Sequence, residues 1–366
     1  MFLGSFLIWK ASYFPLKSKA MREKVRLEPE RILIIQPRQL GDVLLTTPSV
    51  RALRKRFPRS KIAFLVDEPF EPLLRYNQDL DLILVRKKKE LAEPIKTIKK
   101  IRHFSPQLVI DYFANPRTTI ISILSGALIT LSYANKRRSR FYKLRVAPEG
   151  NYVAQEKVSL LKPLGIDYKK EDFHLIFNLP QYAQKRADEI LTERGITPQD
   201  FLVVLDLFHK RPARQWREEY FMEIADRLAE SFKAKVLITC LDINRKRAED
   251  VLSQARKKHL LAPSVNLFEL GALISRANLF LGADAGPKHI AVSQGTPSFT
   301  ILGPSGEQWT PPSPIHKFIA LDVDCRPCSY HQCPKPDHPC LENLTPDMVW
   351  QELEKFIKEI LSRKVS

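Results

Sequence analysis

Two stretches of the sequence place polar side chains directly after an apolar run. In the first, IIQPRQLGDVLLTTPSV, Asp42 follows a turn that contains proline and glycine. In the second, LGADAGPKHIAVSQG, Asp284, Gly286 and His289 separate one apolar run from the next. A carboxylate at a strand end can accept a proton from a hydroxyl group, and a glycine that opens a helix lets phosphate oxygens reach unpaired backbone N–H groups. Ordinary capping of a strand-to-helix turn uses the same residue types, so each stretch alone leaves both interpretations open.

The chain is strongly basic. Its 366 residues include 59 Lys and Arg against 41 Asp and Glu, which gives a net charge of +18 and an isoelectric point near 9.7. Such a surface attracts nucleic acid, an anionic membrane or a phosphorylated substrate, and charge alone does not choose among them. The hydrophobic content of 44% excludes a disordered chain and, at this length, favours two domains.

Several of these cations cluster in and around the tract YANKRRSRFYKLR. A run of charge is commonly a solvated surface. An acceptor that carries phosphate and carboxylate groups would also suit it, because arginine makes bidentate contacts with both. The candidate acceptor-binding residues are Arg38 and Arg117, which follow predicted strands, and Arg137 and Arg138, which lie within the tract.

Eight short apolar runs without alternation predict buried parallel strands. Helical or basic stretches separate them, which is typical of α/β folds. A pause at about residues 168–183 predicts a linker between two Rossmann-like domains. The runs are RILIIQ (31–36), KIAFLV (61–66), LDLILV (80–85), LVIDYF (108–113), FLVVLDLF (201–208), KVLITC (235–240), ANLFLGAD (277–284) and SFTILGP (298–304).

The resulting domain plan has four segments. Residues 1–26 form an apolar and basic leader, residues 27–172 the first domain, residues 173–345 the second, and residues 346–366 a closing helix with Thr345 as its N-cap. The leader is shorter than the roughly 20 apolar residues that span a bilayer, but its composition suits a segment that lies at a membrane interface. A flexible leader with chance hydrophobicity is the alternative.

Four motifs in this order resemble those of glycosyltransferase family 9, which contains the ADP-heptose:lipopolysaccharide heptosyltransferases. IIQPRQLGDVLLTTPSVRALRKRFP resembles its amino-terminal signature, LVIDYFANPRTT an inner strand of its first domain, HKRPARQWREEYFMEIADRL its phosphate-contacting turn, and LGADAGPKHIAVSQGTPSFTILGPS its carboxyl-terminal signature. The resemblance covers about residues 31–360. It implies the GT-B fold, in which two Rossmann-like domains face each other across a cleft, and sugar transfer from a nucleotide donor with inversion.

The resemblance also implies roles for individual residues. Asp42 would be the catalytic base, and Arg214 would contact phosphate where the family usually has lysine. His209 and Lys210 stand where small hydroxyl residues are common, so this part of the donor site departs from the family pattern. Asp242 would bind ribose hydroxyls. The segment that holds the diphosphate and ribose region would comprise Asp284, Ala285, Gly286 and His289.

A cysteine cluster lies in the stretch CRPCSYHQCPKPDHPC. Cys325, Cys328, Cys333 and Cys340 could hold a structural zinc ion, form disulfides or remain unlinked, and the spacing of the second pair differs from that of a common zinc loop. No pair of Asp residues has the context of a catalytic metal site. Catalysis is therefore expected to need no metal and no cofactor beyond the donor substrate.

These observations favour an enzyme that moves heptose from ADP-heptose to the inner core of lipopolysaccharide. It would act in the cytoplasm, peripherally associated with the inner membrane. The same chemistry with another nucleotide sugar or glycan acceptor is the first alternative, and a non-catalytic basic protein that binds membrane or nucleic acid is the second. The motifs argue against the second, because charge alone would not require them. The expected partners are the donor, the lipopolysaccharide acceptor and an anionic membrane surface, without nucleic acid.

Overall fold

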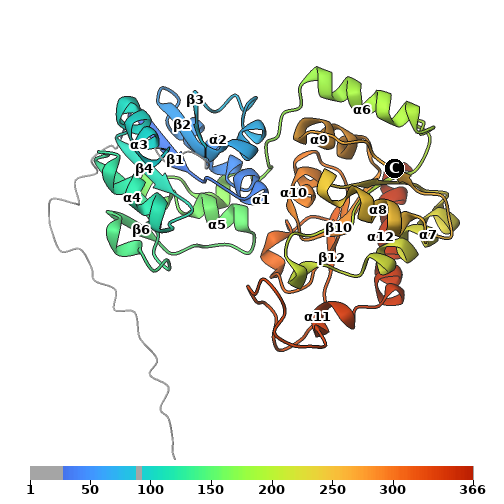
Figure 1. Ribbon diagram of the computed structural model, residues 1–366. Helices are drawn as coiled ribbons and strands as arrows, with labels where there is room; N and C mark the ends of the chain where they lie inside the picture. The colour runs from blue at the N-terminus through green and yellow to red at the C-terminus, as the bar shows by residue number, and fades with distance from the viewer. Residues whose placement is uncertain (1–27, 88–92, 366) are drawn as a thin grey trace, which may run out of the picture.

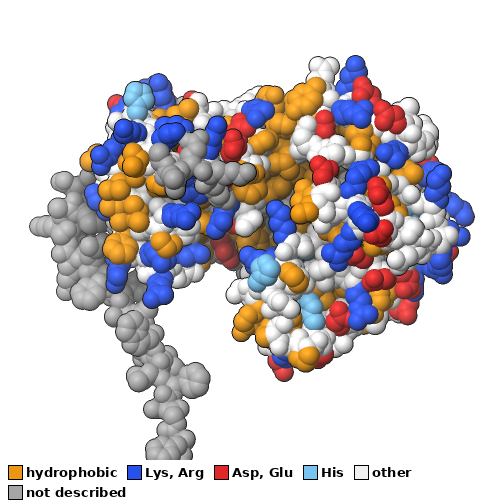
Figure 2. Space-filling view, in the orientation of Figure 1, with side chains coloured by type: hydrophobic (Ala, Val, Ile, Leu, Met, Phe, Trp, Pro, Cys, Tyr) orange, Lys and Arg blue, Asp and Glu red, His pale blue; other side chains and the backbone are white. Residues whose placement is uncertain are grey.

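The structure is a computed structural model that describes residues 28–87 and 93–365. The leader at 1–26 lies outside these residues. Two lobes lie side by side, an N-terminal lobe drawn in blue to green and a C-terminal lobe drawn in yellow to red, and each is built on a parallel six-stranded sheet (Figure 1). A hollow separates them on the face shown in Figure 2.

The sheet of the N-terminal lobe has the strand order β3-β2-β1-β4-β5-β6, with every pair parallel. Successive side chains of β1 point to opposite faces. Ile32 and Ile34 pack with α2 and α5, whereas Leu33 and Ile35 pack with α3 and α4. The strands are β1 (Arg31–Ile35), β2 (Lys61–Asp67), β3 (Leu82–Arg86), β4 (Leu108–Asp111), β5 (Ile129–Tyr133) and β6 (Leu144–Val146), and the helices are α1 (Leu40–Leu44), α2 (Thr47–Arg56), α3 (Glu93–Phe104), α4 (Pro116–Leu124) and α5 (Val153–Ser159).

The sheet of the C-terminal lobe has the order β12-β11-β10-β7-β8-β9 and is also parallel. Helices α6, α9 and α10 contribute to the core on one face, and α7, α8 and α12 to the core on the other. The strands are β7 (Leu202–Asp206), β8 (Lys235–Thr239), β9 (Leu260–Leu261), β10 (Leu279–Ala283), β11 (Ser298–Ile301) and β12 (His316–Ile319), and the helices are α6 (Gln181–Glu193), α7 (Glu218–Phe232), α8 (Arg245–Leu252), α9 (Leu267–Arg276), α10 (Gly286–Ser293), α11 (Pro339–Glu342) and α12 (Pro346–Val365).

Both sheets have the same connectivity, so the predicted α/β fold with two Rossmann-like domains is confirmed. In each sheet the direction of winding reverses between the first and fourth strands, at β1 and β4 in one lobe and at β7 and β10 in the other. Ligands of such sheets bind beyond the carboxyl ends of the strands at this switch point. Strands β5, β6, β9 and β12 were not predicted, because they are short or carry polar residues within them.

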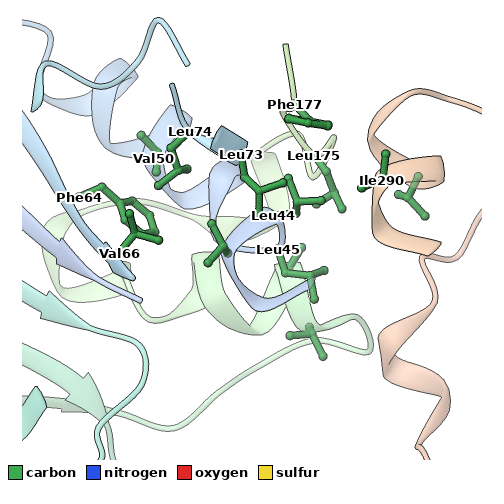
Figure 3. Packing of buried hydrophobic residues seen from close by; sticks show 14 of the residues in the cluster. Leu44, Leu45, Val50, Phe64, Val66, Leu73, Leu74, Leu175, Phe177 and Ile290 are labelled. Carbon is green, nitrogen blue, oxygen red and sulfur yellow. The ribbon is translucent and has the colours of Figure 1, made fainter. Parts of the chain in front are cut away.

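An apolar contact joins the two lobes beside the first switch point. Leu44 of α1 and Leu73, at the end of the 3-10 turn after β2, lie next to Leu175 of the linker (Figure 3). Phe177 continues the contact, and Ile290 of α10 faces it from the C-terminal lobe. The end of α1 is thus held against the other lobe by buried side chains.

Candidate active site

Asp42 lies at the carboxyl edge of the first sheet, where the carboxyl ends of its strands meet. β1 ends at Ile35, and the following turn brings Asp42 into the first turn of α1. Its side chain is 28% exposed, so water and a substrate hydroxyl can reach it. The structure thus places Asp42 at the switch point between β1 and β4, as predicted. Its carboxylate also pairs with a lysine, which a helix-capping role does not require.

That lysine is Lys157 of α5, a residue that the sequence interpretation missed. Its Nζ atom lies 3.6 Å from an Asp42 oxygen and donates a hydrogen bond of 3.2 Å to Oε1 of Gln36. The ring of Tyr112 lies 5.2 Å from the same atom. Burial lowers the pKa of Lys157, and the charge of Asp42 opposes this shift. Helical spacing was the available signal, because Lys157 shares a face of α5 with the buried Val153 and Ala154, four and three residues earlier.

On the other lobe, Asp284 follows β10 at the second switch point. Lys288 Nζ lies 2.5 Å from one of its carboxylate oxygens and Arg214 Nη1 lies 3.3 Å from the other. Burial alone would raise the pKa of Asp284, but the positive charge of Lys288 and the surrounding hydrogen bonds hold this pKa well below its usual range. Asp284 is therefore ionised at neutral pH between two cations, and the cluster of three carries a net positive charge.

Lys288 was also missed by the sequence interpretation. It has no exposed surface, although lysine is seldom fully buried without a partner. Its position four residues after Asp284, within a helix that begins at Gly286, was the signal that could have revealed the pair.

His209 is half-buried beside this cluster, and it lines a cavity of about 580 Å³. Its Nδ1 accepts a hydrogen bond of 2.9 Å from the backbone N–H of Arg211, so its Nε2 carries the proton and donates to the carbonyl oxygen of Asp284 at 3.2 Å. Both ring nitrogens therefore bridge the loops that follow β7 and β10. Burial, followed by the charge of Arg214, lowers the pKa of His209, which keeps it neutral.

Helix α10 points its amino terminus into the same region. Ala285 is its N-cap residue and makes no side-chain capping bond, so backbone N–H groups of the first turn remain available to an anion. His289 is 4% exposed, and burial followed by the charge of Lys288 lowers its pKa to about 3. A neutral His289 can donate one hydrogen bond, and its Nδ1 atom has no hydrogen-bond partner among residues 28–87 and 93–365.

The two halves of the site meet where α1 approaches α10. A β-carbon on Gly41 would lie 2.4 Å from Cδ2 of His289, and one on Gly286 would lie 3.1 Å from the side chain of Leu40. Only the absence of a side chain at Gly41 allows this approach. Helix α1, which carries Asp42, and helix α10 are therefore in direct contact, although they belong to different lobes.

The remaining predicted residues lie around this centre. Lys210 is exposed and borders a cavity of about 580 Å³ that Arg217 and Arg247 also line. Asp242 is exposed in the 3-10 turn that follows β8. The four candidate acceptor residues follow β1, β4 and β5 at the edge that carries Asp42; they are Arg38, Arg117, Arg137 and Arg138. The guanidinium of Arg38 lies 5.6 Å from the centroid of the Phe113 ring.

The cysteine-rich loop contacts the turn that carries Arg214. The N–H of Ala213 donates to the carbonyl oxygen of His331 at 3.1 Å, and Nε2 of His338 donates to the carbonyl oxygen of Ala213 at 3.0 Å. The loop therefore positions the predicted phosphate-contacting turn. Its four cysteines are unlinked in the structure. Residues 28–87 and 93–365 contain no group of three or more His, Cys, Asp or Glu side chains that could hold a metal ion.

Comparison with known proteins decides the family. The family model described as glycosyltransferase family 9 (heptosyltransferase) matches residues 95–338. The chain belongs to this family. Among the relatives of this family 9 glycosyltransferase, lipopolysaccharide heptosyltransferase 3 of Escherichia coli is 28% identical over 281 residues, which are 72% of this chain and 80% of the relative. The family model's match at residues 95–338 includes Arg214 and Asp284 and begins after Asp42.

Two solved structures share the fold of this family 9 glycosyltransferase. The glycosyl transferase family 9 protein from Veillonella parvula has a TM-score of 0.74 and 23% identity, over 90% of this chain and 97% of that one. The ADP-heptose lps heptosyltransferase II of E. coli has a TM-score of 0.71 and 18% identity, over 90% of this chain and 99% of that one. The GT-B fold is confirmed. In the part of the chain that the structure describes, no helix combines the length and the apolar character needed to cross a membrane.

Proposed function

We propose that this enzyme transfers a heptose from ADP-heptose to the inner core of lipopolysaccharide, with inversion at the anomeric carbon. Membership of a heptosyltransferase family supports the sugar, and the names of the E. coli relatives support the donor and the acceptor. We place the enzyme in the cytoplasm, in peripheral contact with the inner membrane that holds the acceptor. The observation that carries the mechanism is the contact of α1 with α10, because it brings Asp42 next to the helix that faces the leaving group.

Asp42 is the general base in this proposal. Its carboxylate takes the proton of the acceptor hydroxyl while the hydroxyl oxygen attacks the anomeric carbon from the side opposite the diphosphate. The new glycosidic bond forms as the bond from the anomeric carbon to the diphosphate oxygen breaks, and ADP leaves with the bonding electrons. Lys157 holds the Asp42 carboxylate through the 3.6 Å contact and so fixes its direction.

The opposite lobe stabilises the charge that builds on the diphosphate. Arg214 and the first N–H groups of α10 supply positive charge and hydrogen bonds, with Ala285 and Gly286 at the point of closest backbone approach. Asp284, held by Arg214 and Lys288, is placed to accept hydrogen bonds from donor hydroxyl groups. The direct contact of α1 with α10 would help to exclude water and suppress hydrolysis of the donor.

The acceptor would bind along the carboxyl edge of the N-terminal lobe. Its phosphate and carboxylate groups match the four arginines that follow β1, β4 and β5, because the planar guanidinium group binds either anion with two hydrogen bonds. These residues are Arg38, Arg117, Arg137 and Arg138.

The test is release of ADP from ADP-heptose, measured with and without a lipopolysaccharide acceptor that lacks the added heptose. We expect acceptor-dependent release that Asp42→Asn abolishes. Glu68→Gln is the matched control, since Glu68 follows β2 at the same edge and its side chain is 61% exposed. Transfer by a folded Asp42→Asn variant at near-normal rate would remove Asp42 as the base. Activity with another nucleotide sugar but none with ADP-heptose would be compatible with the proposed mechanism but would show that ADP-heptose is not the donor.

A further inference from the structure

Helix α4 carries an exposed apolar stripe on the outer face of the N-terminal lobe. Ile120, Ile123 and Leu124 are 53%, 52% and 39% exposed, and their spacing of three and four residues puts them on one side of the helix. Leu128 follows in the next turn and is 69% exposed. These four residues are called the α4 patch. Figure 2 shows apolar side chains gathered over α4, with Lys and Arg side chains around them.

Cations border the α4 patch on several sides. Arg102, at the end of α3, donates through Nε to the carbonyl oxygen of Leu124 at 2.9 Å. Lys143 donates through Nζ to the carbonyl oxygen of Leu128 at 2.5 Å. Arg117 lies one helical turn before the patch begins. Hydrogen bonds to backbone oxygens of the patch thus hold Arg102 and Lys143 beside it, and Arg117 belongs to the same helix as the patch.

The sequence around the α4 patch is strongly basic. Residues 94–148 contain one acidic residue, Asp111, which is fully buried and accepts a 2.6 Å hydrogen bond from the Tyr142 hydroxyl. The same stretch contains eleven basic residues: Lys96, Lys99, Lys100, Arg102, Arg117, Lys136, Arg137, Arg138, Arg140, Lys143 and Arg145. An apolar stripe bordered by cations complements an anionic bilayer, which offers negative headgroups above a hydrocarbon interior.

The described chain begins at the amino edge of the N-terminal sheet. Arg31, the first residue of β1, bonds through Nε to the carbonyl oxygen of Ser105 and through its backbone N–H to Gln107, in the turn between α3 and β4. Leu128, just before β5, also lies at this amino edge of the sheet. The first described residues therefore lie on the side of the lobe where the patch ends.

We propose that the α4 patch and its flanking cations form the face with which this enzyme docks on an anionic lipid bilayer. The inference deepens the membrane contact in the proposed function. α4 has nine residues and spans about 14 Å, and its first turn lies at the carboxyl edge near the acceptor arginines. Docking through α4 therefore brings the acceptor-binding edge close to the lipid surface that presents the acceptor.

The experiment measures binding of the full chain to vesicles of phosphatidylethanolamine and phosphatidylglycerol, compared with vesicles of phosphatidylcholine alone. We expect binding to the anionic vesicles, and a partition coefficient lowered about tenfold or more by the triple change Ile120→Ser, Ile123→Ser and Leu128→Ser. The matched control is Leu241→Ser with Ile243→Ser, which removes apolar residues 58% and 88% exposed on the other lobe. This control should change binding by less than about twofold.

A second pair of variants tests the charges. Lys99→Gln with Lys100→Gln should lower anionic binding about thirtyfold, because each cation near such a surface contributes roughly 1 kcal/mol. The control, Lys185→Gln with Lys258→Gln, removes two exposed cations of the C-terminal lobe and should leave binding to the anionic vesicles unchanged.

Equal losses in the test and control variants would overturn the docking face, as would binding that does not depend on anionic lipid. A change in oligomeric state on replacing the patch, with vesicle binding intact, would identify a protein interface instead. Turnover of a soluble core oligosaccharide reports separately on the proposed function. The triple variant should leave that rate unchanged and lose turnover only with acceptor embedded in vesicles.

Discussion

Replacing Asp42 by Asn removes a proton acceptor and also leaves a buried cation without its partner. The Asp42 carboxylate and Lys157 Nζ are 3.6 Å apart, and the lysine side chain is 5% exposed. At an effective dielectric constant of about 20, two unit charges at 3.6 Å interact by about 4.6 kcal/mol. Water at the partly exposed Asp42 screens part of this, and Lys157 can lose its proton when the partner is gone. We expect Asp42→Asn to lower the free energy of unfolding by about 2 kcal/mol.

The assay is a double-mutant cycle with Lys157→Met, using urea unfolding and turnover on every variant. Lys157→Met alone should cost little stability, because methionine suits the buried stem and water can solvate Asp42, but it should lower kcat about tenfold to a hundredfold through loss of orientation. Both Michaelis constants should stay near those of the parent enzyme. The double variant should regain the stability lost in Asp42→Asn and remain inactive. Lys157→Arg should restore part of the lost kcat.

Two results would refute this reasoning. Additive stability changes in the cycle would mean that the two side chains do not interact. A Lys157→Met enzyme with normal kcat would mean that the lysine does not hold the base in place. Glu68→Gln serves again as the carboxylate control, because Lys87, whose Nζ lies 3.9 Å from the Glu68 carboxylate, is 57% exposed rather than buried.

Three further predictions follow from other contacts. Arg214→Met should weaken ADP binding, measured by calorimetry, about tenfold to a hundredfold, whereas Arg214→Lys should bind ADP almost as tightly as the parent enzyme. An unchanged dissociation constant in Arg214→Met would exclude Arg214 from the phosphate site. Gly41→Ala should lower kcat at least about tenfold while ADP binding stays within about twofold, because the added β-carbon meets His289 and forces α1 away from α10; normal kcat would show that this approach is not needed. Burial raises the pKa of Asp206 to about 7, so its stabilising protonated state is fully present below about pH 4 and is lost as the pH rises through 7. In urea unfolding, Asp206→Asn should therefore be more stable than the parent at pH 8, by up to about 4 kcal/mol, but not at pH 4. An equal difference in stability at both pH values would contradict the raised pKa of Asp206.

The strands at the centre of each sheet could be predicted from the sequence because each is a local run of aliphatic residues. β1, β2, β7 and β10 are buried on both faces, and such strands need no alternating pattern to be recognised. β5 has Thr130 and Ser132 within it and β9 has two residues, so neither forms a run that stands out from its surroundings. The outer strands depend on the sheet that receives them rather than on their own composition.

The sequence by itself determined the class of fold, the two lobes and the motifs that name the family. It also placed Asp42 and Asp284 at strand ends, because the position of a residue after a buried run follows from local pattern. Only the tertiary structure decided what surrounds these two carboxylates. Lys157 reaches Asp42 from a helix more than a hundred residues away, and Gly41 lies against His289 across the lobes. Such contacts depend on how whole helices and sheets pack, and packing sums many weak contacts that no short stretch of sequence contains.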